Sequence, residues 1–372
     1  MPLDKRNAVP SSQYRLLVTA FVVGSSLLLS FIDNMVRQDA WLVVVISFLF
    51  AFPFLAVYVL LAKKLPGKNL MEINDAVFGP VIGKIMSLLY LGYFFILISF
   101  NVLDMADFYI GSVMRETPKM PLIAIALAVA GYGVCKGIRT IAKAGFLSVA
   151  FTIITILATS ALLIKDMDLS NFLPVMEAPK HTLAQSIHIF AALPYCEAFV
   201  LMMVMPSVGN GEKVGRTTLA GAFIGMLLLL LISVRNTAVL GPTTALFATN
   251  SYMAVRLIDV GEFFTRVELF VAISLIGALF IKVMVLLYAM ITGFKTVFGL
   301  KSATALIVPV GGLITVLATI AFSSTVSHAY AGMRYHAFFP LLFEFILPPV
   351  TLLVACIRKL PGDGAEQEDR LQ

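Results

Sequence analysis

The chain has little of what soluble enzymes carry. Of its 372 residues only 13% are charged, and it has three cysteines, four histidines and one tryptophan. Cys135, Cys196 and Cys356 lie in apolar runs, which favours buried thiols over disulfides or metal ligands, and the histidines show no metal-ligand spacing. There is no Gly-rich phosphate loop, HExxH helix or nucleophile elbow. An enzyme is therefore not expected, and no cofactor is predicted.

What the chain does have is apolar sequence. It is 60% hydrophobic, with a mean hydropathy of +0.96. Because a run of about 20 apolar residues spans a bilayer as a helix, the recurrence of such runs from end to end predicts an all-α polytopic membrane protein. Ten spans are predicted, at 14–32, 41–62, 84–113, 119–135, 143–164, 183–206, 216–238, 266–294, 303–324 and 337–357.

The predicted transmembrane domain covers 14–357, between an N-terminal tail at 1–13 and a C-terminal tail at 358–372. The first apolar run follows Lys5 and Arg6, as in a signal peptide, but no small-residue cleavage site comes after it. We therefore expect a retained first helix.

The basic residues predict the orientation. With the N-terminus in the cytoplasm, 17 of the 27 lysines and arginines fall inside and 9 outside, and Lys282 lies within a span. Cytoplasmic loops carry the excess of Lys and Arg, so both termini are predicted to be cytoplasmic. The net charge of +6 is scattered over these short loops, which favours a topological role over binding of nucleic acid.

Ten helices divide into a first half at 14–164 and a second at 183–357. Because five helices per half is an odd number, the second half enters the membrane from the opposite side. Such inverted repeats are typical of secondary transporters, whose binding sites lie where helices in matching positions are interrupted by Gly or Pro. The first helix carries VVGSSLLLS and the sixth AALPYCEA. The candidate ligand-binding residues at these two breaks are Gly24, Ser25, Ser26, Leu193, Pro194, Tyr195 and Glu197.

Two facing breaks predict a particular ligand chemistry. Free N–H groups at a helix N-terminus favour a carboxylate, and free carbonyls favour an ammonium group. An α-amino acid carries both on one carbon, so the breaks are interpreted as an amino-acid clamp. The alternative is a Gly-Ser packing patch in the first helix and a simple proline kink in the sixth.

Several polar side chains fall inside predicted spans. Asn101, Asp104 and Asp107 are three residues apart and share a helix face. They are expected to line an outward vestibule or bind a cation, or else to form a solvated stripe near the outer surface. The second interpretation is favoured for Asp107, and both stay open for Asp104.

Lys282 and Glu197 lie at similar depth near the membrane midplane. Neither charge is tolerable alone there, so the two are expected to pair. The lysine could instead extend to the surface. Tyr93 either caps a ligand or packs between helices. Glu268 and Glu344 are expected nearer the outer ends, without a special role.

Several phrases in order resemble a known family. They are RQDAW at 37–41, LPGKNLMEI at 65–73, RETP at 115–118, and EFFTRVELF at 262–270 followed by FIKVMVLLYA. The chain resembles the spore germination B-subunit family, the GerAB-type permeases of the amino acid–polyamine–organocation superfamily, over nearly its whole length.

The resemblance implies a LeuT-like fold with a 5+5 inverted repeat, located in the spore inner membrane. It also implies a germinant-sensing subunit that works with an A subunit and a C-subunit lipoprotein and binds a nutrient, usually an L-amino acid. Gly24–Ser26, the segment at 193–197 and GYF at 92–94 match the family's broken first helix, its sixth helix and the aromatic position of its third. GSSLLLS departs from the Gly-x-Gly break of many permeases in the superfamily.

The resulting hypothesis is a ten-helix germinant receptor subunit that binds a small zwitterion between the first and sixth helices. The alternative is an amino-acid permease working by alternating access, with proton coupling through Glu197 or Lys282 as an option. A third possibility is a structural scaffold that binds no ligand; it predicts that substitutions at the two breaks leave germination responses unchanged.

Overall fold

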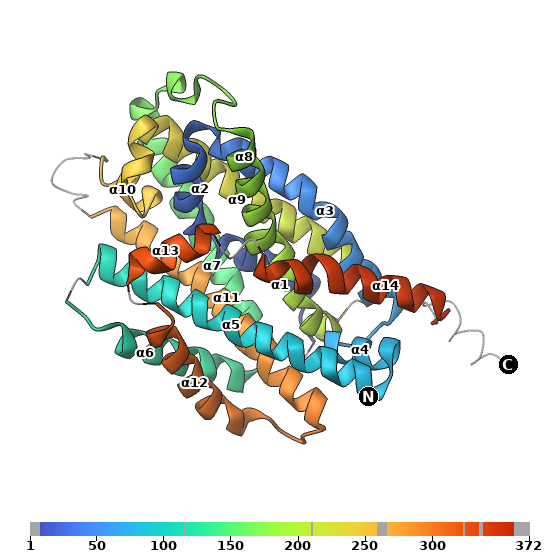
Figure 1. The fold of residues 1–372 in the computed structure, drawn as a ribbon. Helices are drawn as coiled ribbons and strands as arrows, with labels where there is room; N and C mark the ends of the chain where they lie inside the picture. The colour runs from blue at the N-terminus through green and yellow to red at the C-terminus, as the bar shows by residue number, and fades with distance from the viewer. Residues whose placement is uncertain are drawn as a thin grey trace.

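The computed structural model describes residues 8–114, 116–209, 211–258, 266–322, 324–334 and 338–360. Within them the chain forms a bundle of long helices, and Figure 1 shows α2, α8 and α10 toward one end and α4 and α14 toward the other. Most of the two predicted tails (1–7 and 361–372) and the first part of the EFFTRVELF phrase (262–265) lie outside the described residues. The main α-helices of the first half are α1 (Ser11–Val23), α2 (Leu28–Val36), α3 (Ala40–Lys64), α4 (Leu70–Phe78), α5 (Pro80–Ser112), α6 (Lys119–Lys136) and α7 (Ile138–Leu162).

The second half begins with a helix that changes type along its length. Its main elements are α8 (Lys180–Phe190), the π-helix η4 (Ala191–Tyr195), the 3-10 helices η5 (Cys196–Met203) and η8 (Gly241–Leu246), α9 (Val214–Leu240), α10 (Asn250–Val255), α11 (Glu268–Phe298), α12 (Ile307–Ile320), α13 (Thr325–Arg334), the π-helix η11 (Leu341–Ile346) and α14 (Leu347–Ile357).

Seven helical stretches in the described residues are long and apolar enough to cross a membrane, or eight if the bent pair formed by α12 and α13 counts as one span. The first predicted span is divided between the short α1 and α2, and the last lies in the short stretch Leu341–Ile357. The all-α membrane class is confirmed, whereas the count of ten stays a prediction.

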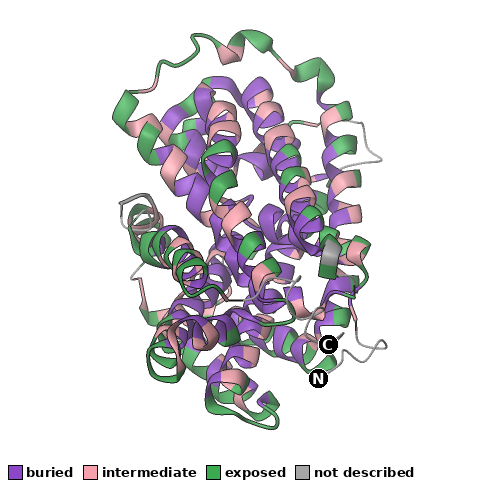
Figure 2. Ribbon diagram, turned by 90° about the vertical axis from the view of Figure 1, so that its right-hand side faces the viewer, coloured by how far each residue is buried: buried purple, intermediate pink, exposed green. Residues whose placement is uncertain are grey.

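The burial pattern is that of a protein surrounded by lipid. Figure 2 shows buried residues toward the middle of the bundle and exposed ones on its outside and in the loops. Many outward side chains are nevertheless apolar, such as Leu147 and Val308, which are 68% and 81% exposed. Water would disfavour so much apolar surface, whereas bilayer hydrocarbon covers it. The most enclosed of these stretches are Lys180–Met203 and Glu268–Phe298, in which 83% and 72% of the residues in the most apolar part are buried.

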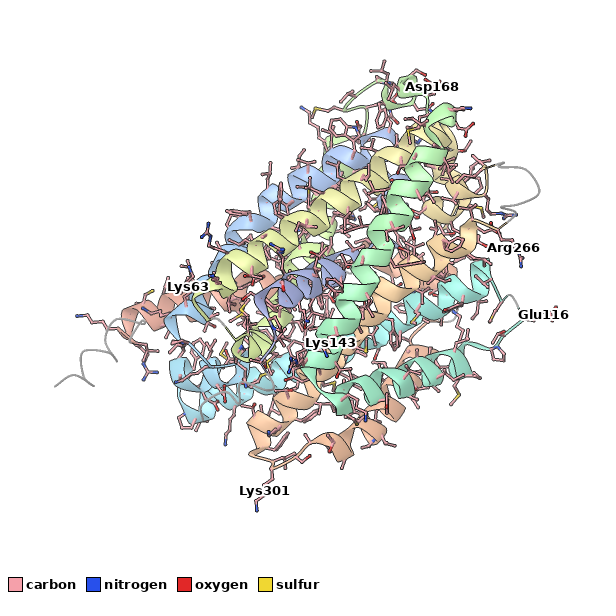
Figure 3. The ribbon with its side chains drawn as sticks, turned by 180° about the vertical axis from the view of Figure 1, so that it is seen from behind. Lys63, Glu116, Lys143, Asp168, Arg266 and Lys301 are labelled. Carbon is pink, nitrogen blue, oxygen red and sulfur yellow. The ribbon has the colours of Figure 1, made fainter. Side chains whose placement is uncertain are left out.

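Basic side chains separate along the bundle. Figure 3 places Lys63, Lys143 and Lys301 toward one end of the molecule and Arg266 toward the other. This grouping follows the predicted inside and outside sets. The direction of the chain across the membrane itself stays a prediction.

The first helix breaks where its sequence is GSSL. Helix α1 ends at Val23, residues 24–27 form a turn, and α2 resumes at Leu28. Serine hydroxyls compete for backbone hydrogen bonds and weaken a helix interior. Gly24 also has a packing reason, because a Cβ there would lie 2.9 Å from the carbonyl oxygen of Ala278 and 3.0 Å from Cβ of Lys282. The break therefore rests directly on α11.

The sixth predicted helix is interrupted differently. Pro194 lies in the π-helix η4, and η5 continues as eight residues of 3-10 helix. Proline has no N–H to donate and displaces the preceding turn, and 3-10 runs of more than three or four residues are uncommon. The sixth helix therefore consists of a wide π-helical turn followed by tight 3-10 turns, instead of regular α-helix, where it passes the break in the first helix.

Small residues bring α1 and α9 together. Gly221 and Gly225 have the spacing that marks close helix contacts. A Cβ at Gly221 would lie 2.5 Å from the carbonyl oxygen of Arg15 and 2.7 Å from Cβ of Val18, and one at Gly225 would lie 2.7 Å from Val22. The first helix thus lies flush against α9 over two turns.

We expect Gly221→Ala to destabilise the protein by about 1–3 kcal/mol, because the methyl group overpacks the contact with the α1 backbone. Gly92→Ala is the matched control, since Gly92 is an exposed helical glycine with open space around its Cβ position; there alanine should be neutral or slightly stabilising. Thermal unfolding of the detergent-solubilised variants measures both. Equal melting temperatures for the two variants would contradict the close contact.

Candidate functional site

A cavity lies beside the break in the first helix. Its volume is about 780 Å³ including its open mouth, and its walls come from the first helix, α5, the sixth helix, α11 and α13. Apolar side chains such as Leu28, Phe31 and Leu279 form much of the lining. The predicted site residues that line it are Gly24, Ser25, Asp104, Leu193, Glu197 and Lys282.

The charged centre of the cavity wall is an ion pair between α11 and η5. Nζ of Lys282 lies 2.6 Å from Oε2 of Glu197 and donates to Oγ of Ser25 at 2.7 Å. The lysine is 2% exposed and the glutamate fully buried. The structure thus joins the two charges that the sequence places at one depth.

This arrangement ties three helices together at one point. Oγ of Ser25 accepts from Lys282 and donates to the carbonyl of Leu193 at 3.3 Å, beside Pro194. The ammonium also lies over the ring of Phe21, 5.4 Å from its centroid. A buried charge is stable only when it is paired and hydrogen-bonded, so the break in the first helix, the proline segment and α11 depend on one another.

The predicted amino-acid clamp needs free backbone N–H groups at the break in the first helix, but several of these groups are already hydrogen-bonded. The N–H groups of Ser25, Ser26 and Leu28 each donate to the backbone carbonyl three residues back, which belongs to Val22, Val23 and Ser25 respectively. The backbone has tightened to a 3-10-like turn instead of opening. At the break itself, the positive charge that faces the cavity is therefore the Lys282 ammonium.

Acceptors for a cation face the same cavity. Oε1 of Glu197 is buried and has no hydrogen-bond partner among the described residues, although the amide of Asn101 lies close by. Asp104 lines the cavity with its side chain 38% exposed, and its Oδ1 lies 3.7 Å from Nδ1 of His328. Two carboxylates and one ammonium thus border a largely apolar space.

Four of the predicted ligand residues do not line this cavity: Ser26, Tyr93, Pro194 and Tyr195. Ser26 is buried, and its Oγ has no hydrogen-bond partner in the described part of the chain. Tyr195 donates to the carbonyl of Val44 at 3.2 Å and packs edge-on against Phe48. These contacts support a packing role for Tyr195.

Tyr93 lies in a second polar centre. Its hydroxyl donates to Oε1 of Glu344 at 2.7 Å, and its ring stacks on Phe343 with centroids 4.4 Å apart. Glu344, which was expected nearer an outer end and without a special role, is fully buried and is the hydrogen-bond acceptor of Tyr93. Sequence position indicates depth along a helix, but it does not reveal which neighbours enclose a side chain.

The interpretation of Asp107 as part of a solvated stripe is also wrong. Asp107 is 8% exposed, lies 2.6 Å from Nζ of Lys119, and accepts from Thr325 at 2.8 Å. Nδ1 of His328 lies 3.1 Å from its Oδ2. This cluster joins α5, α6 and α13 beside the cavity, to which His328 also contributes.

Sequence reasoning also missed a buried network around Arg235, which is 2% exposed. Its guanidinium donates to Thr159 and Asn236, and Asn236 donates to Ser251. The neighbouring Asn250 donates to a carboxylate oxygen of Asp33, at 2.6 Å. The available signal was an arginine inside the predicted span at 216–238 and an aspartate directly after the span at 14–32. The network anchors α2 and α10 to α9.

The comparisons with known proteins agree on one family. The chain matches the family described as spore germination protein over residues 8–326. It belongs to that family. It is 23% identical to spore germination protein KB of Bacillus subtilis (strain 168) over 367 residues, covering 96% of this chain and 97% of the relative. It is 25% identical to spore germination protein A2 of the same strain over 330 residues, covering 86% and 87%.

Two solved structures that share the fold are transporters. A Na⁺-coupled sialic acid symporter, in a substrate-bound outward-open state, matches with a TM-score of 0.64 at 13% identity, covering 90% of this chain and 79% of the other. Mhp1, a nucleobase-cation-symport-1 family transporter in a closed conformation, matches with 0.61 at 12% identity, covering 96% and 93%. These matches confirm a LeuT-like fold for this family member. The protein is a multi-pass integral membrane protein; the relatives it matches are germination proteins and the fold neighbours are transporters, not enzymes.

We expect Lys282→Met to destabilise the protein by about 3–5 kcal/mol, because it leaves the Glu197 carboxylate buried and unpaired. Adding Glu197→Gln removes the remaining charge and should restore much of the loss. Thermal unfolding of the single and double variants in detergent measures this coupling. Lys119→Met is the control, since its side chain is 26% exposed and Asp107 keeps His328 and Thr325 as partners. Purely additive losses in the double variant would contradict a buried ion pair.

Proposed function

We propose that this protein is the B subunit of a nutrient germinant receptor and that a small zwitterion, an L-amino acid, binds in the cavity between the broken first and sixth helices. The observation that carries the proposal is the cavity itself. The Lys282–Glu197 pair and the acidic Asp104 line this cavity beside the break in the first helix, in a chain that belongs to the spore germination family.

The lining matches an amino acid in charge and polarity. The ammonium of Lys282 is the donor for a ligand carboxylate. Oε1 of Glu197 and the carboxylate of Asp104 are acceptors for an α-ammonium group. Leu28, Phe31 and other apolar side chains surround the remaining space, which favours a ligand whose side chain is apolar. Ligand sites typically combine such an apolar lining with a few placed polar groups.

The ligand acts by favouring one packing of the helices. Ser25 connects the break to Lys282 and to the carbonyl beside Pro194, so a ligand that competes for Lys282 or Glu197 alters the contacts among the first helix, the sixth helix and α11. A ligand shifts such an equilibrium only by its difference in affinity for the two arrangements. In the proposed receptor, an A subunit and a C-subunit lipoprotein detect the change in the spore inner membrane, with both termini of this subunit in the cytoplasm.

The alternative function is an amino-acid permease that works by alternating access, with or without proton coupling. The observation in its favour is that the two solved structures compared above are transporters. Uptake of radiolabelled amino acids into proteoliposomes separates the two functions: a permease accumulates the label, whereas a receptor binds without accumulation. Genes for an A-type subunit and a lipoprotein in the same operon favour the receptor.

We expect Asp104→Asn and Leu193→Trp to shift the amino-acid dose–response of spores that germinate through this receptor. Loss of a charge-assisted hydrogen bond costs about 1.5–3 kcal/mol, which raises the half-maximal concentration about tenfold or more. Tryptophan at Leu193 fills the cavity and should abolish the response.

The measurement is loss of optical density over a panel of L-amino acids, at receptor levels matched by immunoblot. Asp166→Asn and Leu169→Trp are the matched controls, because both residues are exposed and lie away from the cavity. Dose–response curves that stay the same for all four variants would remove the cavity from germinant recognition.

A further inference from the structure

Glu344 is a second buried carboxylate that the proposed germinant site does not use. It lies in the π-helix η11 and is fully buried. Its Oε1 accepts the hydrogen bond from Tyr93, whereas its Oε2 is buried without a hydrogen-bond partner among the described residues. A half-satisfied carboxyl group in a membrane interior is unfavourable unless something neutralises it, and such residues commonly have a function.

The local backbone holds this carboxyl group in place. A π-helix displaces carbonyls from the regular α-helical ladder, and such turns are frequent at functional sites. Two tyrosines use these carbonyls: Tyr58 donates to the carbonyl of Glu344 at 2.8 Å, and Tyr90 donates to that of Phe343 at 3.2 Å. Residues from α3 and α5 thus fix η11 against the middle of the bundle.

No cation in the described part of the chain neutralises Glu344. Its carboxylate has no lysine, arginine or histidine nitrogen within 4.0 Å there, and the nearby ammonium of Lys282 is bound to Glu197 and Ser25. The one ammonium near these two buried carboxylates is therefore paired with Glu197 and not with Glu344. Among the described residues, the titratable and charged groups around Glu344 are Tyr58 of α3, Tyr90 and Tyr93 of α5, His188 of α8 beside Phe345, Cys196 and Glu197 of η5, and Lys282 of α11.

A proton fits this site better than a metal ion. A hard cation needs several converging oxygen ligands, but the hydroxyls of Tyr58 and Tyr90 are directed at backbone carbonyls. Among the described residues no group of three or more His, Cys, Asp and Glu side chains converges on a metal position. A proton needs no extra space and removes the buried charge altogether.

We propose that the carboxyl group of Glu344 is a proton-binding site. It holds a proton on Oε2 while Tyr93 donates to Oε1 and η11 packs against η5. When these elements separate and water reaches Oε2, the O–H bond breaks, the proton passes to water and the carboxylate keeps its hydrogen bond from Tyr93. The packing of η11 on the sixth helix is thereby linked to proton concentration, whichever nutrient the receptor binds.

The test is infrared spectroscopy of the purified full-length protein near neutral pH, without any ligand, so that its outcome is independent of the germinant proposal. The carbonyl-stretch band of a protonated carboxylic acid should be present in the wild type and lost in Glu344→Gln. Glu268→Gln is the matched control and should keep the band, since Glu268 lies at the start of α11 with Arg266 4.0 Å away. Loss of an ionised-carboxylate band in Glu344→Gln, or no change, would overturn the proposal.

Glutamine has the shape of a protonated glutamate, so Glu344→Gln is expected to fold with an unchanged melting temperature at neutral pH. If it does not fold, Tyr93→Phe provides the second variant, because it removes the hydrogen bond to Oε1. The same band should then shift in frequency. An unshifted band in Tyr93→Phe would show that the protonated group is elsewhere.

Discussion

The ion pair between Lys282 and Glu197 is the interaction on which the arrangement of the central helices depends. Each residue alone would leave a charge in the membrane interior, which is costly unless a partner and further hydrogen bonds are supplied. The break at Ser25 supplies one of these bonds, and the absence of a side chain at Gly24 lets α11 come close enough for the pair to form. The interrupted first helix, the proline segment of the sixth and α11 are therefore parts of one polar centre.

This centre also explains why interruptions that weaken a helix are accepted in a bilayer. In hydrocarbon every backbone polar group needs an internal partner. At the first helix the break tightens to a turn with hydrogen bonds three residues back, and the Ser25 hydroxyl donates to the carbonyl of Leu193 in the sixth helix. At η11 tyrosines from α3 and α5 satisfy the displaced carbonyls.

The fold class was predictable because hydropathy is a strong signal over a span of about 20 residues. The positions of both breaks were predictable as well, since GSS and the proline at position 194 each weaken an α-helix for a known local reason. The pairing of Lys282 with Glu197 followed from equal depth and opposite charge. The number of crossings was harder to obtain, because α1 and the last helix are short and α12 bends toward α13.

The sequence by itself determined that this is a helical membrane protein of the spore germination family, with interruptions in its first and sixth predicted helices and opposite charges inside two spans. Only the tertiary structure decided which side chains share a space. Tyr93 lies at Glu344 and not at the cavity, Asp107 is buried under α13, and Asn101 and His328 contribute to the cavity wall. The physical reason is that hydropathy and helical periodicity place a residue along a helix and on one of its faces. The rotation and tilt of each helix against its neighbours depend on packing between segments far apart in the chain.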